Sequence, residues 1–190
     1  SSLRTVSTIK RSDLVFLIAD AEAGFRSQDR RIAGMAVDFY KGLVIGVNKW
    51  DLVDKTRFDA ADYERGIKET SKFLRFAPVL TLSAKTGLRV RKVLDFLERV
   101  SEERKKRIPT AELNDLLEEM VARRPPPAVA GKRANILYAT QNGTDPPIFV
   151  FICSGAKFVP DSYKRFIINN LRREYGFEGV PLKLIFTERK

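Results

Sequence analysis

Residues 1–107 alternate short apolar runs with longer segments in which apolar residues recur at helical spacing. The short runs have strand length and carry no polar alternation; they are 14–19, 43–47 and 79–82. The helical patterns cover 28–40, 59–76 and 90–100, and the last runs into four basic residues. Apolar strands separated by helices are typical of a parallel sheet covered on both faces. We therefore expect an α/β domain here.

Residues 108–190 follow a different order of elements. A helical pattern starts at Thr110, a plausible N-cap, and stops before three prolines at 125–127 that must be extended. Two strand-like runs then flank a turn signal, a second helix ends at Gly176, and a final strand follows. The runs are 135–141, 148–153, 160–175 and 181–187. This order predicts a small α+β domain.

The overall charge favours an anionic partner. Lys and Arg total 35 against 24 Asp and Glu, a net charge of +11, and nucleic acid is the first candidate for such a partner. The sequence has no His and only one Cys, which excludes zinc sites of the usual Cys/His kind and Ser-His or Cys-His nucleophiles. We expect no metal site from these residues. No apolar run is long enough to span a membrane, and none is expected to.

The motif Asn48-Lys49-Trp50-Asp51 directly follows the second predicted strand. Ligands of parallel α/β sheets bind at the carboxyl ends of strands, where this motif lies. The Asp51 carboxylate can accept two hydrogen bonds from N1–H and the exocyclic amine of guanine, which adenine cannot supply. Asn48 can bond the base and brace the neighbouring loop, and the Lys49 stem can lie over the base. Trp50 is expected to pack against the sheet edge.

A second motif, Ser83-Ala84-Lys85, follows the third predicted strand. We expect the Ala84 N–H to face guanine O6 and Lys85 to cover the opposite side of the base. Each motif alone is weak, and the alternative is a turn that uses Asn and Asp for local hydrogen bonds. Their occurrence at two successive strand ends is more specific. The predicted guanine site consists of Asn48, Lys49, Asp51, Ser83, Ala84 and Lys85.

Several basic residues are candidates for RNA contact, with a solvated protein surface as the alternative. Four of them recur eight residues apart on the predicted helix 160–175, which indicates one helical face. Two more follow the prolines, and a run of four follows the helical pattern that begins at 90. The candidates are Arg104, Lys105, Lys106, Arg107, Lys132, Arg133, Lys164, Arg165, Arg172 and Arg173.

The paired guanine motifs resemble those of Ras-like P-loop GTPases. The surrounding residues 18–21, 28–34 and 47–53 resemble the second GTPase domain of the bacterial tandem GTPases called EngA or Der. Residues 109–190, including Pro146-Pro147, resemble that family's C-terminal KH-like domain. The resemblance implies part of a Ras-like P-loop GTPase domain over 1–107, with a parallel sheet and helices on both faces, followed by a KH-like α+β domain over 108–190.

The resemblance also implies a function. Members of this family are GTPases that act in assembly of the large ribosomal subunit and contact rRNA, so we expect GTP or GDP as ligand. We further expect a monomeric protein of the bacterial cytoplasm that does not associate with a membrane. The resemblance implies a KH-like domain that lacks the usual RNA-binding G-x-x-G loop, because we interpret Gly176–Gly179 as a turn.

Two GTPase motifs are absent from the 190 residues: no G-x-x-x-x-G-K-[ST] and no D-x-x-G occurs. The family places both upstream of Ser1, and phosphate binding and Mg²⁺-dependent hydrolysis require them. We therefore expect a piece of a longer protein that holds no catalytic residue, is inactive alone, and binds Mg²⁺ only with the upstream segment. The alternatives are a non-enzymatic RNA-binding protein with a degenerate GTPase remnant, and another Ras-like GTPase with an unrelated basic tail.

Overall fold

The computed structural model describes residues 2–189 and divides into two compact units. The first unit runs to Arg104 and also includes Phe177–Pro181. The second unit covers Lys105–Gly176 and continues from Leu182. The sequence pattern placed a single boundary after residue 107 and did not anticipate that a segment near the C-terminus belongs to the first unit.

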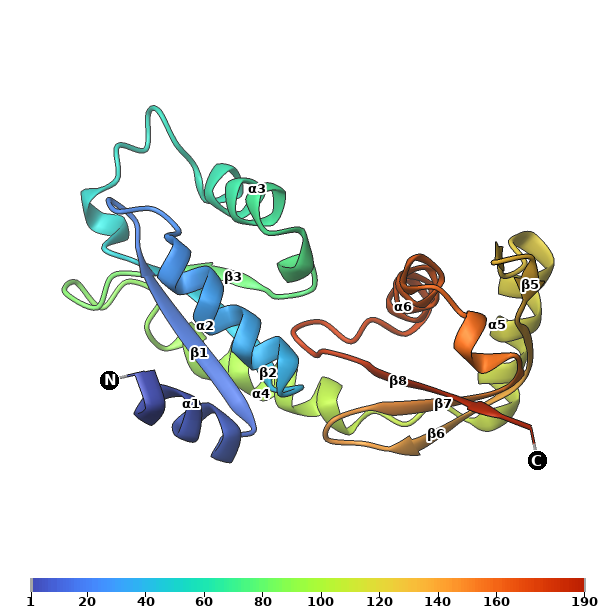
Figure 1. The fold of residues 1–190 in the computed structure, drawn as a ribbon. Coiled ribbons are helices and arrows are strands. Elements are labelled where there is room, and N and C mark those ends of the chain that lie inside the picture. Colours follow the sequence, from blue (N-terminus) through green and yellow to red (C-terminus); the bar gives the residue numbers. More distant parts are fainter. Residues whose placement is uncertain (1, 190) are drawn as a thin grey trace. The chain divides into compact units, whose positions relative to one another are not determined.

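A three-stranded parallel sheet forms the centre of the first unit (Figure 1). Its strands are β1 (Leu14–Asp20), β2 (Gly42–Asn48) and β3 (Val79–Thr81), with β2 in the middle. The register pairs Asp20 with Asn48 and Val47 with Thr81. The residues that follow all three strands therefore meet at one edge of the sheet, and the predicted parallel arrangement is confirmed.

The helices of this unit follow the predicted order. They are α1 (Ser2–Arg11), α2 (Ser27–Asp38), α3 (Ala60–Thr70) and α4 (Lys92–Lys105), with 3₁₀ turns at Trp50–Leu52 and Lys72–Leu74. Helices α2 and α3 are shorter than predicted, whereas α4 extends beyond residue 100. Asp59 caps α3 by accepting a hydrogen bond from the Asp62 N–H at 2.8 Å. The helix ends at Thr70, whose hydroxyl bonds back to the Gly66 carbonyl, so the predicted helix 59–76 was too long. No prediction was made for α1.

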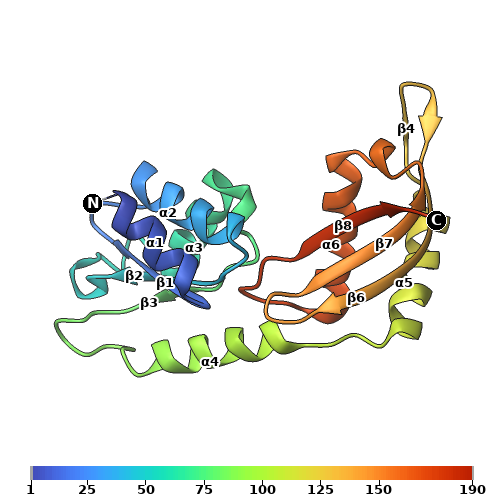
Figure 2. The ribbon, with the colours of Figure 1, turned by 60° about the horizontal axis from the view of Figure 1, so that its bottom comes forward.

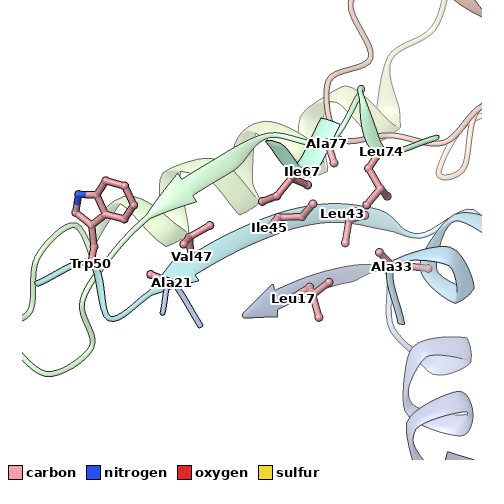
Figure 3. Packing of buried hydrophobic residues seen from close by; sticks show 11 residues of the cluster. Leu17, Ala21, Ala33, Leu43, Ile45, Val47, Trp50, Ile67, Leu74 and Ala77 are labelled. Carbon is pink, nitrogen blue, oxygen red and sulfur yellow. The ribbon is translucent and has the colours of Figure 1, made fainter. Parts of the chain in front are cut away.

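The two faces of β2 show why helices cover both sides of this sheet. Leu43, Ile45 and Val47 point into one apolar cluster, which also contains Ala33 of α2 (Figure 3). On the other face a Cβ at Gly42 would lie 2.8 Å from Val100 of α4. Residues one apart in a strand face opposite sides, so α2 and α4 pack on opposite faces, as predicted.

The segment Phe177–Pro181 pairs with the first unit through backbone hydrogen bonds. The Leu43 N–H donates to the Gly179 carbonyl at 2.8 Å, and the Gly179 N–H donates to the Phe76 carbonyl at 2.7 Å. Phe177 and Val180 are fully buried. Phe177–Pro181 is therefore a packing segment of the first unit.

The second unit is a three-stranded sheet packed with two helices (Figure 2). The central strand β7 is antiparallel to β6 and parallel to β8. The elements are α5 (Thr110–Arg123), β4 (Ala128–Val129), β5 (Lys132–Arg133), β6 (Asn135–Gly143), β7 (Ile148–Ser154), a 3₁₀ turn (Ala156–Phe158), α6 (Asp161–Tyr175) and β8 (Lys183–Glu188). The predicted α+β layer is confirmed. Pro109, rather than Thr110, occupies the N-cap position of α5, and the β4–β5 hairpin was not predicted.

Two side-chain amides join β6 to the helix and chain segment before it. Asn114 of α5 accepts from the Ala139 N–H at 2.9 Å and donates to the Ala139 carbonyl at 2.8 Å. The buried Gln141 accepts from the Ile108 N–H at 2.8 Å and donates to the Lys106 carbonyl at 2.9 Å. Because a buried amide without partners is costly, these bonds fix where α5 begins against the sheet.

Cys153 lies on β7 and is fully buried. Burial raises the pKa of its thiol to about 11, which keeps it protonated near neutral pH. The Cys153 thiol is therefore unreactive near neutral pH. Within residues 2–189 no helix has the length and hydropathy needed to cross a membrane.

Substituting Gly179 by Ala should destabilise the first unit by about 2–4 kcal/mol, because a Cβ there meets Val100 and the backbone has a positive φ. The clash distance is 2.4 Å and φ is +72°. Gly24→Ala is the matched control, since Gly24 has a φ of +70° and nothing within 4 Å of its Cβ position. It should cost about 1 kcal/mol. Urea unfolding followed by Trp50 fluorescence measures both, and equal losses would contradict the packing role of Gly179.

Candidate functional site: a base-sized cavity at the sheet edge

A cavity of about 340 Å³ lies where the loops after β2 and β3 meet. Its volume falls in the range of about 300–1,000 Å³ that small-molecule sites occupy. The cavity is lined by Leu52 and by the whole predicted guanine set, namely Asn48, Lys49, Asp51, Ser83, Ala84 and Lys85. Residues from two motifs about 35 positions apart are thus brought together by the parallel register.

Asn48 ties the two loops to each other. Its Oδ1 accepts a hydrogen bond from the Ala84 N–H at 2.9 Å. The neighbouring Trp50 N–H donates to the Leu82 carbonyl at 3.0 Å. The sequence analysis expected the Ala84 N–H to face a ligand oxygen; in this structure it donates to Asn48 instead, so binding guanine O6 requires that N–H to be shared or released.

Asp51 carries an unused acceptor in the cavity. Its Oδ1 is buried and has no hydrogen-bond partner among residues 2–189. The Ser83 hydroxyl is the main cause that lowers the pKa of Asp51, and the Lys85 and Lys55 charges add to it. Asp51 is therefore ionised at neutral pH. A buried carboxylate oxygen without a donor is unfavourable, so a ligand that brings N–H donors gains binding energy there.

Ser83 holds the second loop in its shape. The residue is fully buried, and its N–H donates to the Leu88 carbonyl at 3.0 Å. Its Oγ accepts from the Thr86 N–H at 3.2 Å. With that bond made, the Ser83 hydroxyl proton is free to be directed at Asp51. Ser83 thus supports the carboxylate from the protein side and leaves the ligand side open.

Lys49 is held by an acid that the sequence analysis missed. Lys49 has a left-handed backbone, with φ of +64°, and its Nζ lies 2.7 Å from Oδ2 of Asp20 at the end of β1. Asp20 Oδ1 also accepts from the Glu22 N–H at 2.9 Å and the Ala23 N–H at 3.3 Å. The hydrogen bond with Lys49 lowers the pKa of Asp20 and raises that of Lys49. The sequence did offer a signal for this ion pair: Asp20 ends the strand that lies beside the strand ending at Asn48.

Trp50 anchors the loop after β2 by packing against the protein. It is 4% exposed and meets the Tyr63 ring edge-on, with centroids 5.2 Å apart. The Tyr63 hydroxyl donates to the Ala21 carbonyl at 2.6 Å. As predicted, Trp50 packs on the protein, which leaves Lys49 and Asp51 on either side of it to face the cavity.

Arg104 is corrected as an RNA candidate. It is 2% exposed, and its Nη1 donates to the Tyr40 carbonyl at 2.8 Å. Successive helix residues rotate by about 100°, so a run of four basic residues at a helix end cannot all face solvent. Arg104 occupies the position that faces the sheet, against Gly42.

The other basic residues of that run divide between structural and exposed roles. The Lys106 Nζ donates to the Tyr175 carbonyl at 2.6 Å, within the second unit. The Arg107 Nη1 donates to the Gln141 carbonyl at 3.0 Å, although the residue remains exposed. Lys105 is exposed as well. Lys105 and Arg107 are therefore the members of this run that a polyanion can reach.

The four basic residues of α6 do not form the single solvated face that their spacing indicated. Burial lowers the pKa of Arg172 to about 10, whereas Arg165 and Arg173 are exposed. Lys164 is half-buried and pairs with Asp161 at 3.0 Å. Arg172 is partly buried, which a pattern of charges alone does not show.

Lys132 and Arg133 lie on the short hairpin strand β5, and both are exposed. The Lys132 Nζ lies 5.6 Å from the centroid of the Phe158 ring. The hairpin turn between them and β4 uses Ala130 and Gly131, both with positive φ. These two cations remain available on the surface of the second unit.

Asp20→Asn should release the Lys49 ammonium, because the salt bridge needs the ionised carboxylate. A lowered pKa means that the ion pair contributes above the usual value of about 3.9 and is lost as the pH falls through the lower value. NMR titration of the Asp20 carboxyl carbon measures this pKa, and the Lys49 Nζ signal should sharpen in the Asn variant. An Asp20 carboxyl that titrates at or above about 3.9 contradicts the ion pair.

Arg104→Ala should destabilise the first unit by about 2 kcal/mol, because it leaves the Tyr40 carbonyl without its donor. Lys105→Ala, which removes an exposed neighbour of the same charge, should change stability by less than about 0.5 kcal/mol. Urea unfolding separates the two variants. If they behave alike, Arg104 is not a structural residue.

Two family models together cover nearly all of the chain. The model for the elongation factor Tu GTP-binding domain matches residues 3–103. The model described as the KH-domain-like region of EngA bacterial GTPase enzymes, C-terminal, matches residues 107–187. The first match spans the base-sized cavity, and the second spans the α+β unit.

Curated relatives match along the whole chain. The GTPase Der of Chloroflexus aggregans is 41% identical over 191 aligned positions, which are 100% of this chain and 42% of that protein. The GTPase Der of Desulfitobacterium hafniense is 42% identical over 186 positions, 98% of this chain and 42% of that protein. The chain thus spans about two fifths of the length of these relatives. A solved structure of Aquifex aeolicus Era aligns at 16% identity with a TM-score of 0.41, covering 96% of this chain and 67% of that one.

Proposed function

Because this chain belongs to the EngA/Der family of GTPases, we propose that its cavity at the sheet edge binds the guanine base of GTP and GDP. The observation that carries this proposal is Asp51, which lines the cavity together with both motifs and whose buried Oδ1 has no hydrogen-bond partner among the described residues. Guanine presents two N–H donors on one edge, which suits an ionised carboxylate. Adenine presents a lone pair there and would be repelled.

Each residue of the cavity then has a separate role. Asp51 accepts from N1–H and the exocyclic amine, and Ser83 keeps the carboxylate ionised. Lys49, held by Asp20, and Lys85 would lie over the two faces of the base with their aliphatic stems. The Ala84 N–H would turn from Asn48 to the base oxygen, so that a wrong base leaves these groups unpaired.

The residues fit the base and not the metal. Among residues 2–189 no group of three Asp, Glu, His or Cys is placed to hold a cation. The 190 residues also contain no glycine-rich phosphate loop. Mg²⁺ supplies charge neutralisation at the phosphates during GTP hydrolysis. We propose that these residues select the nucleotide, and that hydrolysis depends on phosphate- and Mg²⁺-binding residues outside the printed sequence.

We further propose that the protein acts in assembly of the large ribosomal subunit, as a monomer in the bacterial cytoplasm, with rRNA as a partner. The net charge of +11 and the match to a KH-like domain support an RNA partner. The exposed cations that could contact RNA are Lys105, Arg107, Lys132, Arg133, Arg165 and Arg173.

Titration of the ¹⁵N-labelled chain with GDP and with ADP tests the base assignment. GDP should shift the amide signals of Asn48, Ala84 and Lys85, and ADP should not. Asp51→Asn should weaken GDP binding about 100-fold, because two hydrogen bonds to a charged acceptor are lost, and should favour the xanthine nucleotide. An amide donor at residue 51 suits the carbonyl that xanthine carries in place of the amine.

Asp54→Asn is the matched control, because Asp54 is exposed and bonds Thr56 outside the cavity. It should leave the preference for guanine unchanged. Equal responses to GDP and ADP in the unmodified chain would remove the guanine assignment and favour the non-enzymatic RNA-binding alternative.

A further inference from the structure

The first unit has a second hollow, of about 510 Å³, on the side of α3. Its walls come from the segment before α2, from α2, from the loop before α3 and from α3 itself. We call it the aromatic groove. The lining residues that matter for the argument are Phe25, Phe58, Tyr63 and Ile67, with Arg30 and Arg57.

The apolar part of the groove contains a ring that the protein leaves uncovered. Phe58 is 51% exposed, although its ring meets Tyr63 edge-on with centroids 6.3 Å apart. Tyr63 is fixed by its hydroxyl to the Ala21 carbonyl and by contact with Trp50. Phe58 therefore stands on a rigid support with half of its surface in water. An exposed aromatic ring on a rigid support is a ready surface for stacking.

The charges at the groove favour an anion. Arg57 is exposed, and no side-chain partner for its guanidinium is found among residues 2–189. The Arg30 guanidinium donates to the Ser27 hydroxyl at 3.2 Å, and no other side-chain partner for it is found among residues 2–189. The acid that also lines the groove, Asp62, is already used: it accepts from the Asp59 N–H at 3.1 Å and from Arg65 at 3.2 Å. The two arginines thus face the groove without a competing free carboxylate in its lining.

We propose that the aromatic groove binds single-stranded RNA, with an unstacked base on Phe58 and neighbouring phosphates on Arg57 and Arg30. Stacking on an aromatic ring beside guanidinium groups is how proteins hold single strands without reading sequence. The net charge of +11 favours a polyanion. The exposed Phe58 ring favours RNA over an acidic peptide, because a peptide would use the arginines and leave the ring with no planar partner. This inference deepens the RNA contact of the proposed function and is independent of the guanine cavity.

The test is fluorescence anisotropy of a labelled oligoadenylate of about ten nucleotides, binding to the full 190-residue chain at low salt. Phe58→Ala should weaken binding about tenfold. Phe58→Leu should weaken it similarly, since it keeps an apolar side chain but removes the flat ring. Arg57→Glu should weaken binding and lower the slope of log K against log salt by about 0.7, which a merely structural change would not do.

Phe73→Ala and Arg75→Glu are matched controls. Phe73 is 46% exposed and Arg75 is exposed, both in the first unit and outside the groove. Phe73→Ala should change RNA binding by less than about twofold. Arg75→Glu should weaken binding less than Arg57→Glu does, because it reverses a charge that lies outside the groove. Urea unfolding of each variant identifies any that fail to fold, and Phe58→Leu then decides the role of the ring.

The outcomes separate this inference from the guanine assignment. If the groove variants bind RNA like the unmodified chain, or if they lose binding of polyglutamate but not of RNA, the inference is overturned. The GDP-induced shifts at Asn48 and Ala84 should persist in every groove variant. If those shifts are absent from the unmodified chain, the guanine assignment fails, whereas loss of RNA binding in Phe58→Leu still supports the groove.

Discussion

The parallel register of β1, β2 and β3 is the constraint on which the site depends. The register pairs Asp20 with Asn48 and Val47 with Thr81, so the chain segments that follow the three strands all begin at the same edge of the sheet. Everything in the cavity follows from that edge: Asn48 can reach the Ala84 amide, and Lys49 can reach Asp20. A slip of one residue would turn these side chains to opposite faces and separate the motifs. The buried, unalternating β2 resists such a slip because both of its faces are covered.

Charge alone describes this protein poorly, because its arginines and lysines perform two different tasks. Arg104 and Lys106 donate hydrogen bonds to backbone carbonyls. Part of the excess of positive charge therefore has a structural role within the two units. Arg57 and Lys105 keep their charge at the surface. The distinction rests on position relative to a packed neighbour, so a count of charged residues overstates the surface that attracts RNA.

Much of the fold, and the meeting of the two motifs at one cavity, could be predicted from the sequence, since apolar runs, helical spacing and two short motifs are local signals. What failed was non-local. Arg104 and Arg172 look like surface cations in a pattern, and only the neighbouring elements bury Arg104 and partly bury Arg172. Asp20 escaped notice because its partner lies on the next strand. The occupied Ala84 amide depends on the same long-range contact with Asn48.

The return of residues 177–181 to the first unit has a consequence for synthesis of the chain. Most of this unit is encoded before residue 105, yet Leu43 receives the Gly179 carbonyl as its acceptor only after residues 105–176 of the second unit have been made. Until then the Leu43 amide and the surface later covered by Phe177 and Val180 stay open to water. The first unit is therefore a discontinuous domain: its three strands are translated well before Gly179, and it can close only after residues 105–176 of the second unit have been made.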